Sequence, residues 1–323
     1  MGSLTAVTIG VPTYRRPADL RVLIPMLLEH ARLLLEHSPG SYAVRVLIID
    51  NDPAFSARPV CEDFSSPMLC YVNEAEPGIA AVRNRAIDES WASDLLVMID
   101  DDERPKDRWL EALISTWEQT RPALVSGRVV ADYNGELDPW IAAGEFFRRR
   151  NMPTGTPIDV AAAGNVLLDL KQIRAMRVRF STSLGLRGGE DTLFSRELHG
   201  RGGRMIWCAE SVIVDQVPAN RMTRRWVLVR AWSHGNAAVL NDLALASGAR
   251  GRALVRLRRS LGGSARVVAG GGRFVAGLVL RSPRHQARGL RMAMRGVGML
   301  SGALGHVHQE YARRAEVGIN VAA

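Results

Sequence analysis

The stretch Asp94-Leu-Leu-Val-Met-Ile-Asp-Asp-Asp-Glu103 gives the strongest indication of the fold of this chain. Residues 94–99 predict a buried parallel strand, and four acidic residues follow it directly. Carboxylates this close together repel one another, so the run is either a solvated acidic turn or the binding site of a divalent cation. Pro105 predicts that the strand stops at once and that a helix begins near Lys106. Acids at the rim of an open α/β sheet lie where such sheets bind ligands, which favours the cation site.

Strand and helix patterns alternate through the first 100 residues. The expected strands cover residues 4–11, 42–49, 68–72 and 94–99, and the expected helices cover 17–37 and about 77–91. This alternation predicts an α/β fold with a mostly parallel sheet flanked by helices. The chain contains no GxGxxG after the first strand and no GxxxxGK[ST], so neither a dinucleotide-binding fold nor a P-loop is supported.

Length and composition indicate a globular protein. A chain of 323 residues with 47% hydrophobic content buries a substantial core, as one large domain or as one domain with an extension. Cys61, Cys70 and Cys208 form no CxxC pair, which argues against a disulfide framework or a zinc site and favours a reducing compartment. The first residues show no secretory signal pattern. We therefore expect a cytoplasmic location.

The charge of the chain is unevenly distributed. Residues 220–323 contain 18 Arg, no Lys and three acidic residues, a net charge of +15. The preceding 219 residues contain 24 basic and 30 acidic residues, a net charge of −6, within an overall charge of +9. The sequence therefore predicts a weakly acidic body, residues 1–220, followed by an Arg-rich helical extension, residues 221–323.

Five motifs stand in order along the chain. Three follow predicted strands, one opens a predicted helix, and the last begins a later helix. They are Val11-Pro-Thr-Tyr-Arg-Arg16, Ile48-Ile-Asp-Asn51, Gly78-Ile-Ala-Ala-Val-Arg-Asn-Arg-Ala86, Ile99-Asp-Asp-Asp-Glu103 and Gly188-Gly-Glu-Asp-Thr192. In this order they resemble the family 2 glycosyltransferases, which have the GT-A fold, and the resemblance covers residues 4 to about 235. It implies a catalytic GT-A domain that binds a nucleotide sugar.

The resemblance also implies the residues that hold the donor. Asp50 would accept a hydrogen bond from the base, and the same pocket would be lined by Pro12, Thr13 and Tyr14. Arg16 and Arg83 would meet the nucleotide, and Asp100 would face the ribose and the metal, with Asp101 beside it. From the residues alone, the alternative for Asp50 is a helix or turn cap, and the alternative for Arg83 is a cation on a helix surface.

The same resemblance implies a Mn²⁺ or Mg²⁺ site. Asp100 and Asp102 form its DxD pair, with Asp102 as the direct ligand. Many relatives complete the metal shell with a His just before a Val-Pro pair, where this chain has Asp215-Gln-Val-Pro218. Asp215 either ligates a hard cation through oxygen or is not a ligand.

Sugar transfer from a nucleotide diphosphate requires a stabilised leaving group and a base for the acceptor hydroxyl. Asp191 is the candidate base, with Glu190 beside it, although both carboxylates would also suit the cap of a helix over residues 192–199. Gly164, Asn165 and Gly189 are the expected acceptor contacts, since glycine permits close approach. Residues 133–157 contain aromatics that either cover the site or pack on the body.

The extension predicts helices from residue 222 onward, including 254–261 and 290–304. An apolar run at 265–280 is interrupted by Arg266 and Arg273 and is too short to span a membrane. Basic amphipathic helices lie on anionic membranes, so we expect either peripheral contact with the inner face of a membrane or packing on the body.

The sequence thus predicts a metal-dependent and inverting glycosyltransferase. The expected donor is a nucleotide-diphosphate sugar, UDP-sugar above GDP- or dTDP-sugar, and the expected acceptor is a lipid-linked or nucleotide-linked hydroxyl. Two alternatives remain: a sugar-phosphate nucleotidyltransferase of related fold, and a non-catalytic binder of nucleic acid or membrane through the basic tail. A nucleotidyltransferase would carry a Gly- and Arg-rich loop after its first strand, and nucleic-acid binding would require interleaved aromatics, so we expect no nucleic acid partner.

Overall fold

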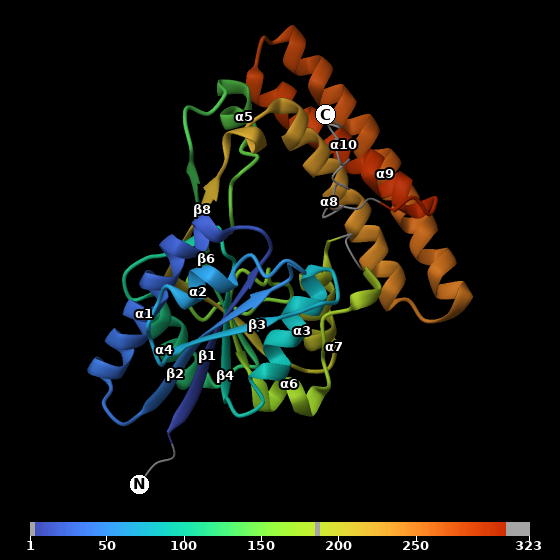
Figure 1. Ribbon diagram of the computed structural model, residues 1–323. Coiled ribbons are helices and arrows are strands. Elements are labelled where there is room, and N and C mark those ends of the chain that lie inside the picture. The colour runs from blue at the N-terminus through green and yellow to red at the C-terminus, as the bar shows by residue number, and fades with distance from the viewer. Residues whose placement is uncertain (1–3, 185–187, 308–323) are drawn as a thin grey trace, which may run out of the picture.

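The computed structural model describes residues 4–184 and 188–307. Within these residues an eight-stranded mixed sheet forms the centre of the molecule, with the strand order β3-β2-β1-β4-β7-β6-β8-β5 (Figure 1). The strands are β1 Thr5–Thr13, β2 Tyr42–Asp50, β3 Leu69–Asn73, β4 Leu95–Ile99, β5 Glu103–Pro105, β6 Leu124–Tyr133, β7 Asn165–Asp169 and β8 Met205–Val217.

The first half of the sheet is parallel and is covered by helices on both faces. Strands β1 to β4 pair in parallel, and successive residues alternate between the two faces, as Leu47 and Ile48 do. Leu47 packs in the core under α3, α6 and α7, whereas Ile48 packs in the core under α1 and α4. The predicted α/β fold of GT-A type is confirmed. These helices and two short ones are α1 Pro17–His37, α2 Arg58–Glu62, α3 Ile79–Glu89, α4 Trp109–Thr120, α5 Pro139–Gly144, α6 Leu170–Met176 and α7 Glu190–Gly200.

The second half of the sheet is mixed. Strand β7 lies antiparallel between β4 and β6, and β5 pairs antiparallel with β8. The sequence predicted that a turn and then a helix beginning near Lys106 follow the acidic run. The helix is present, but the short strand β5 that precedes it was not predicted. The chain first forms β5, the Lys106 amide donates to the Val212 carbonyl at 2.9 Å, and α4 begins only at Trp109. A three-residue strand has too little sequence pattern to be recognised before its partner is known.

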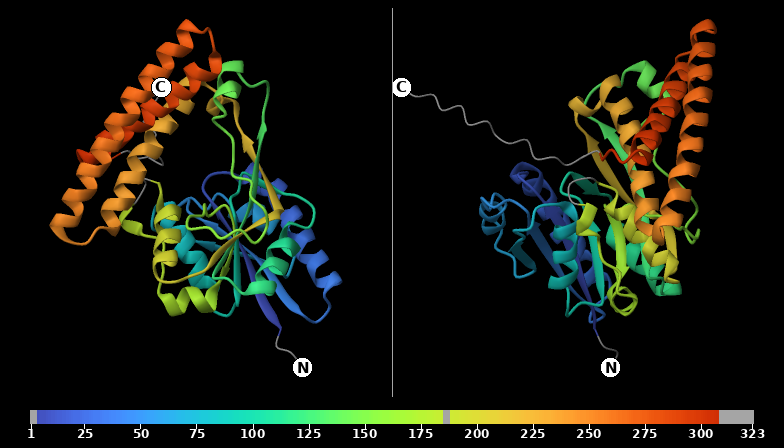
Figure 2. Two further views of the ribbon diagram at one scale, coloured as in Figure 1. Left: turned by 180° about the vertical axis from the view of Figure 1, so that it is seen from behind. Right: turned by 90° about the vertical axis from the view of Figure 1, so that its right-hand side faces the viewer.

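Three helices follow the sheet: α8 Arg224–Leu245, α9 Gly248–Val279 and α10 Pro283–Ala303. They confirm the predicted helical extension, although α9 and α10 are longer than the sequence indicated. They lie to one side of the sheet, and the long strands β6 and β8 reach toward them (Figure 2). Among the described residues, no helix has both the length and the apolar character that a membrane crossing requires.

The aromatic side chains of residues 133–157 join the extension to the body. Trp140 and Phe147 are buried in one cluster with Val227 of α8 and Ala287 of α10. The Phe147 ring stacks on Trp226, with ring centroids 6.0 Å apart. Of the two expectations for this segment, packing therefore holds for these two aromatics.

Candidate active site

The acidic run forms the turn between β4 and β5. The central carboxylate, Asp101, is buried and accepts hydrogen bonds from the Thr13 hydroxyl at 2.8 Å and from Arg16 Nη1 at 2.7 Å. The side chains on either side are more accessible, with 35% of Asp100 and 23% of Asp102 exposed. Of the first three acids of the run, one is thus buried and two are accessible.

Arginine side chains surround the two accessible carboxylates. Arg16 pairs with Asp102 at 2.6 Å, and Arg221 approaches the same carboxylate at 3.9 Å. Arg83 lies 3.4 Å from Asp100. Acids and arginines side by side can bind a diphosphate and a divalent cation together, because each group in the site then faces an opposite charge.

Glu103 anchors the other end of the turn. It is buried, and its Oε2 accepts from the Asp100 amide at 3.0 Å. Burial raises the pKa of Glu103 well above its usual value, and the carboxylates of Asp100, Asp102 and Asp215 raise it further. Gly164, just before β7, lies against this group, since a Cβ there would be 2.7 Å from Glu103 Oε1 and 3.1 Å from Asp100 Oδ2. The predicted acceptor-side glycine therefore borders the acidic turn.

The ends of β1 and β2 pair with each other beside the acidic turn. Pro12 and Thr13 are buried and Tyr14 is half-buried. Asp50 is fully buried and accepts hydrogen bonds from the Asp52 and Ala57 amides, each at 2.9 Å, and from the Tyr71 hydroxyl at 3.1 Å. These bonds match the turn-cap alternative for Asp50, and its contact with a base stays a prediction.

A buried ion pair lies beneath the acidic turn. Arg83 of α3 pairs with Glu190 at the start of α7, and the exposed fractions of the two side chains are 7% and 4%. Burial raises the pKa of Glu190, although Arg83 opposes this effect. Because Arg83 also reaches Asp100, one guanidinium connects α3, α7 and the turn.

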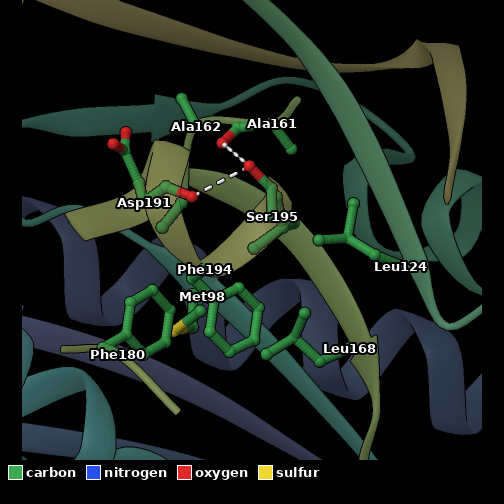
Figure 3. Close-up of a pocket in the computed structure, with 11 residues that line it drawn as sticks. Met98, Leu124, Ala161, Ala162, Leu168, Phe180, Asp191, Phe194 and Ser195 are labelled. Carbon is green, nitrogen blue, oxygen red and sulfur yellow. Dashed lines mark hydrogen bonds between the residues drawn. The ribbon is translucent and has the colours of Figure 1, made fainter. Parts of the chain in front are cut away.

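Asp191 lies beside Glu190 at the first turn of α7. It is half-buried at the edge of a small pocket, and its carboxylate points away from the Phe180 and Phe194 rings (Figure 3). Its main-chain carbonyl accepts from the Ser195 hydroxyl at 2.9 Å, and its Oδ1 accepts from the Thr192 amide at 2.6 Å. Although 35% of the Asp100 side chain is exposed, the loss of water around it is the main cause of its raised pKa, and the charge of Asp191 adds to this effect.

The glycine turn before α7 is held by the extension. Gly188 and Gly189 have φ values of 78° and 88°, a left-handed conformation that favours glycine. The Asn241 side chain of α8 donates to the Gly189 carbonyl at 3.0 Å. Neither Asn241 nor Arg221 was predicted, because neither stands in a motif and the tail has only a general excess of Arg.

Two other predicted residues have partners within the fold. Asp215 of β8 pairs with Arg149, and its neighbour across the sheet is Glu103. The Asn165 side chain is buried, donates to the Arg128 and Ser211 carbonyls at 3.1 Å each, and accepts from Trp109 Nε1 at 2.8 Å. The Asn165 side chain therefore has a structural role inside the sheet, whereas Asp215 lies close to the acidic turn.

The acidic turn suits a metal that is shared with the substrate. The described residues contain no group of three or more His, Cys, Asp or Glu side chains arranged to hold a metal ion. Mg²⁺ is commonly held by one or two carboxylates together with substrate phosphates, and Asp100 and Asp102 supply that number.

Comparison with known proteins agrees with this geometry. The model of the family described as glycosyl transferase family 2 matches residues 8–180. The succinoglycan biosynthesis protein ExoM of Rhizobium meliloti (strain 1021) is 31% identical over 307 residues, which is 93% of each chain. The chain therefore belongs to glycosyl transferase family 2, and it is a glycosyltransferase.

Solved structures share the fold at low sequence identity. S. aureus TarS 1-349 in complex with UDP-GlcNAc matches with a TM-score of 0.53 and 11% identity over 90% of both chains. GalNAc-T7 with UDP, GalNAc and Mn²⁺ matches with a TM-score of 0.53 and 10% identity. That match covers 73% of this chain but only 51% of GalNAc-T7.

Proposed function

We propose that this protein transfers a sugar from a UDP-sugar to an acceptor hydroxyl, with inversion at the anomeric carbon and with Mn²⁺ or Mg²⁺. The observation that carries the proposal is the arrangement of Asp100 and Asp102 at the end of β4, with arginines beside them and Asp191 nearby on α7. The UDP-bound TarS and GalNAc-T7 structures, which share the fold, support the choice of donor.

The donor would lie across the carboxyl ends of β1, β2 and β4. Pro12, Thr13, Tyr14 and Asp50 border the region for the base, and Asp100 and Asp102 would hold the metal against the diphosphate. The bound cation supplies charge stabilisation for the departing diphosphate. Arg16 and Arg221 add positive charge at the same place, since both reach Asp102.

Inversion requires a single displacement. The acceptor oxygen forms its bond to the anomeric carbon while the bond from that carbon to the diphosphate oxygen breaks, and the acceptor proton passes to the Asp191 carboxylate. Asp191 suits this step because Arg83 pairs with its neighbour Glu190, which leaves Asp191 as the half-buried carboxylate of the two. A general base of this kind contributes roughly 10²- to 10⁴-fold to the rate.

The acceptor would approach from the side of Gly164 and Gly189. Gly164 borders the acidic turn, and Gly189 positions the first turn of α7. The predicted lipid-linked or nucleotide-linked acceptor stays a proposal, as do the cytoplasmic location and a metal contact of Asp215. The free cysteines Cys61, Cys70 and Cys208 suit a reducing compartment.

Donor choice can be tested by thermal unfolding with UDP, GDP and dTDP, each with Mn²⁺, with Mg²⁺ and with EDTA. A ligand at 100 times its Kd stabilises the folded chain by about 2.7 kcal/mol. Because UDP with metal is the proposed ligand, it is expected to give the largest increase in the melting temperature. Equal shifts with EDTA would contradict the metal dependence, and a larger shift with GDP would contradict the donor.

The base can be tested with Asp191→Asn. This variant is expected to lower the transfer rate by roughly 10²- to 10⁴-fold while the UDP-dependent thermal shift stays unchanged. Glu197→Gln, at a half-buried carboxylate on the same helix, is the control. The anomeric configuration of the product, determined by NMR, tests inversion directly.

A further inference from the structure

Helix α9 presents two different faces. One face packs closely on α10 through three glycines at a spacing of seven residues. A Cβ on Gly263 would lie 3.0 Å from the Gly296 carbonyl, and one on Gly270 or Gly277 would lie 2.6 Å from a main-chain nitrogen of α10. This face is fully used by the hairpin that α9 and α10 form.

The opposite face carries exposed branched side chains. Successive helix residues are about 100° apart, so these six positions fall within an arc of about 60° on the side away from the glycines. They extend over 25 residue steps, about 38 Å at 1.5 Å per residue. We call them the outer stripe: Leu254, Leu257, Leu261, Val268, Val275 and Val279, with exposed fractions from 55% to 78%.

The outer stripe lies at the edge of the molecule. Figures 1 and 2 show α9 along the outer side of the extension, with α8 and α10 between it and the body. A continuous apolar stripe of this size on a protein surface indicates an interaction site, because single exposed apolar residues are common but aligned ones are not.

The charges around the stripe are of one sign. Residues 248–303, from the start of α9 to the end of α10, contain 12 Arg and no Asp, Glu or Lys. Arg250, Arg252, Arg256, Arg258 and Arg266 of α9 are exposed. A second copy of this chain would bring the same cations together across the interface, and like charges in that arrangement oppose association.

We propose that the outer stripe docks on an anionic lipid surface, with the Leu and Val side chains in the acyl boundary and the arginines against the headgroups. An apolar face with basic residues beside it and no acids has the composition of helices that lie in a membrane interface. Anionic lipids supply the negative charge that this face lacks.

Lipid docking would fix the distance of the active site from the membrane. Asp242 of α8 accepts from Arg196 of α7 at 2.6 Å and from Arg259 of α9 at 2.5 Å, so one carboxylate ties the docking helix to the helix of Asp191. This consequence rests on the proposed function, since it makes a lipid-linked acceptor the favoured one. The docking itself does not depend on it.

The test is flotation of the full chain with vesicles of phosphatidylcholine alone or with 30% phosphatidylglycerol, about a third of the lipid as in a strongly anionic leaflet. Binding to the anionic vesicles is expected, with loss at high salt. Leu257→Gln, Leu261→Gln and Val268→Gln combined are expected to weaken it by about tenfold or more. Arg250→Gln with Arg258→Gln, two exposed arginines that lie within about 40° of the stripe, is expected to reduce the preference for anionic lipid.

The matched control combines Leu4→Gln, Val22→Gln and Trp91→Gln, exposed apolar residues of the body. This control is expected to bind like the wild type. Equal binding by the stripe variant and the wild type would overturn the proposal. It would also be overturned if light scattering showed a dimer that the stripe variant converts to a monomer. UDP-sugar hydrolysis in solution is expected to be equal in all variants, and its absence in the wild type would count against the function and not against the docking.

Discussion

Arg83 of α3 and Glu190 of α7, which are 107 residues apart in the sequence, form a buried ion pair. Arg83 also approaches Asp100 at 3.4 Å, so the pair lies directly beneath the proposed donor site. Breaking such a pair leaves an uncompensated charge inside the protein. The arrangement therefore couples the stability of the fold to the geometry of the acidic turn.

The first prediction concerns this pair. Arg83→Ala is expected to lower the free energy of unfolding by about 3–5 kcal/mol, because Glu190 would remain buried without its partner. Arg85→Ala on the same helix breaks a partly exposed pair with Glu89 and is expected to cost less than about 1 kcal/mol. Urea denaturation of both variants measures the difference, and similar costs would show that the Arg83 pair is not important for stability.

The second prediction separates two neighbouring acids. Asp102→Ala is expected to leave folding nearly unchanged and to reduce metal-dependent transfer by about a hundredfold or more, since a Lewis acid contributes several kcal/mol to the transition state. Asp101→Ala is expected to destabilise the fold by about 1–3 kcal/mol, because it leaves Thr13 and Arg16 without a buried acceptor. Metal titrations of the rate and denaturation curves of both variants are the measurements. Full metal-dependent turnover in Asp102→Ala would refute the proposed site.

The third prediction concerns the turn before α7. Gly189→Ala is expected to lower stability by about 1–2 kcal/mol, since its left-handed φ of 88° disfavours a Cβ. The new Cβ would also lie 3.2 Å from Asn241 Nδ2 and disturb the contact with α8. Gly200→Ala at the end of the same helix, where a Cβ meets open space, is the control and is expected to be neutral or stabilising. Thermal unfolding distinguishes the two, and a neutral Gly189→Ala would mean that the turn has another conformation.

The fourth prediction concerns pH. His30 packs against the Trp109 ring, with ring centroids 5.6 Å apart. Burial lowers the pKa of His30 below its usual 6.5, and the opposing charges of Asp107, Glu111 and Glu29 do not restore it. The unfolded chain therefore takes up this proton at a higher pH than the folded chain, so the free energy of unfolding is expected to fall as the pH drops below about 6.5.

His30→Gln is expected to make this pH dependence shallower, and His285→Gln on α10 serves as the control. Urea denaturation between pH 5 and pH 8 measures the slope for each protein. An unchanged slope in His30→Gln would show that His30 is not one of the groups responsible.

The parallel half of the sheet was predictable because its signals are local. The expected strand ends fall within two residues of β1 to β4, and the helix expected at residues 17–37 matches α1. Apolar runs and a Pro near the helix start depend only on neighbouring residues. Strands β5 and β7 pair antiparallel with distant partners, and no local pattern specifies those partners.

The candidate site was predictable to a similar extent. The acidic run and the Gly-Gly-Glu-Asp motif indicated where carboxylates gather, but not that Asp101 lies inside and Asp102 near the surface. That division follows from contacts with Thr13 and Arg16, far away in the sequence. Arg221 and Asn241 escaped the sequence analysis for the same reason, since their importance arises only when the extension folds against the body.

The direction of β7 also bears on how new specificities arise on this scaffold. Because β7 runs opposite to β4, Asn165 pairs with Ile99, and Gly164 meets the acidic turn that leaves β4. The loop that enters β7 and the turn proposed to hold the donor thus share one rim, while the strands behind them carry the fold. Grafting a different loop before Gly164 is therefore a direct route for redesigning what the enzyme glycosylates without rebuilding its framework.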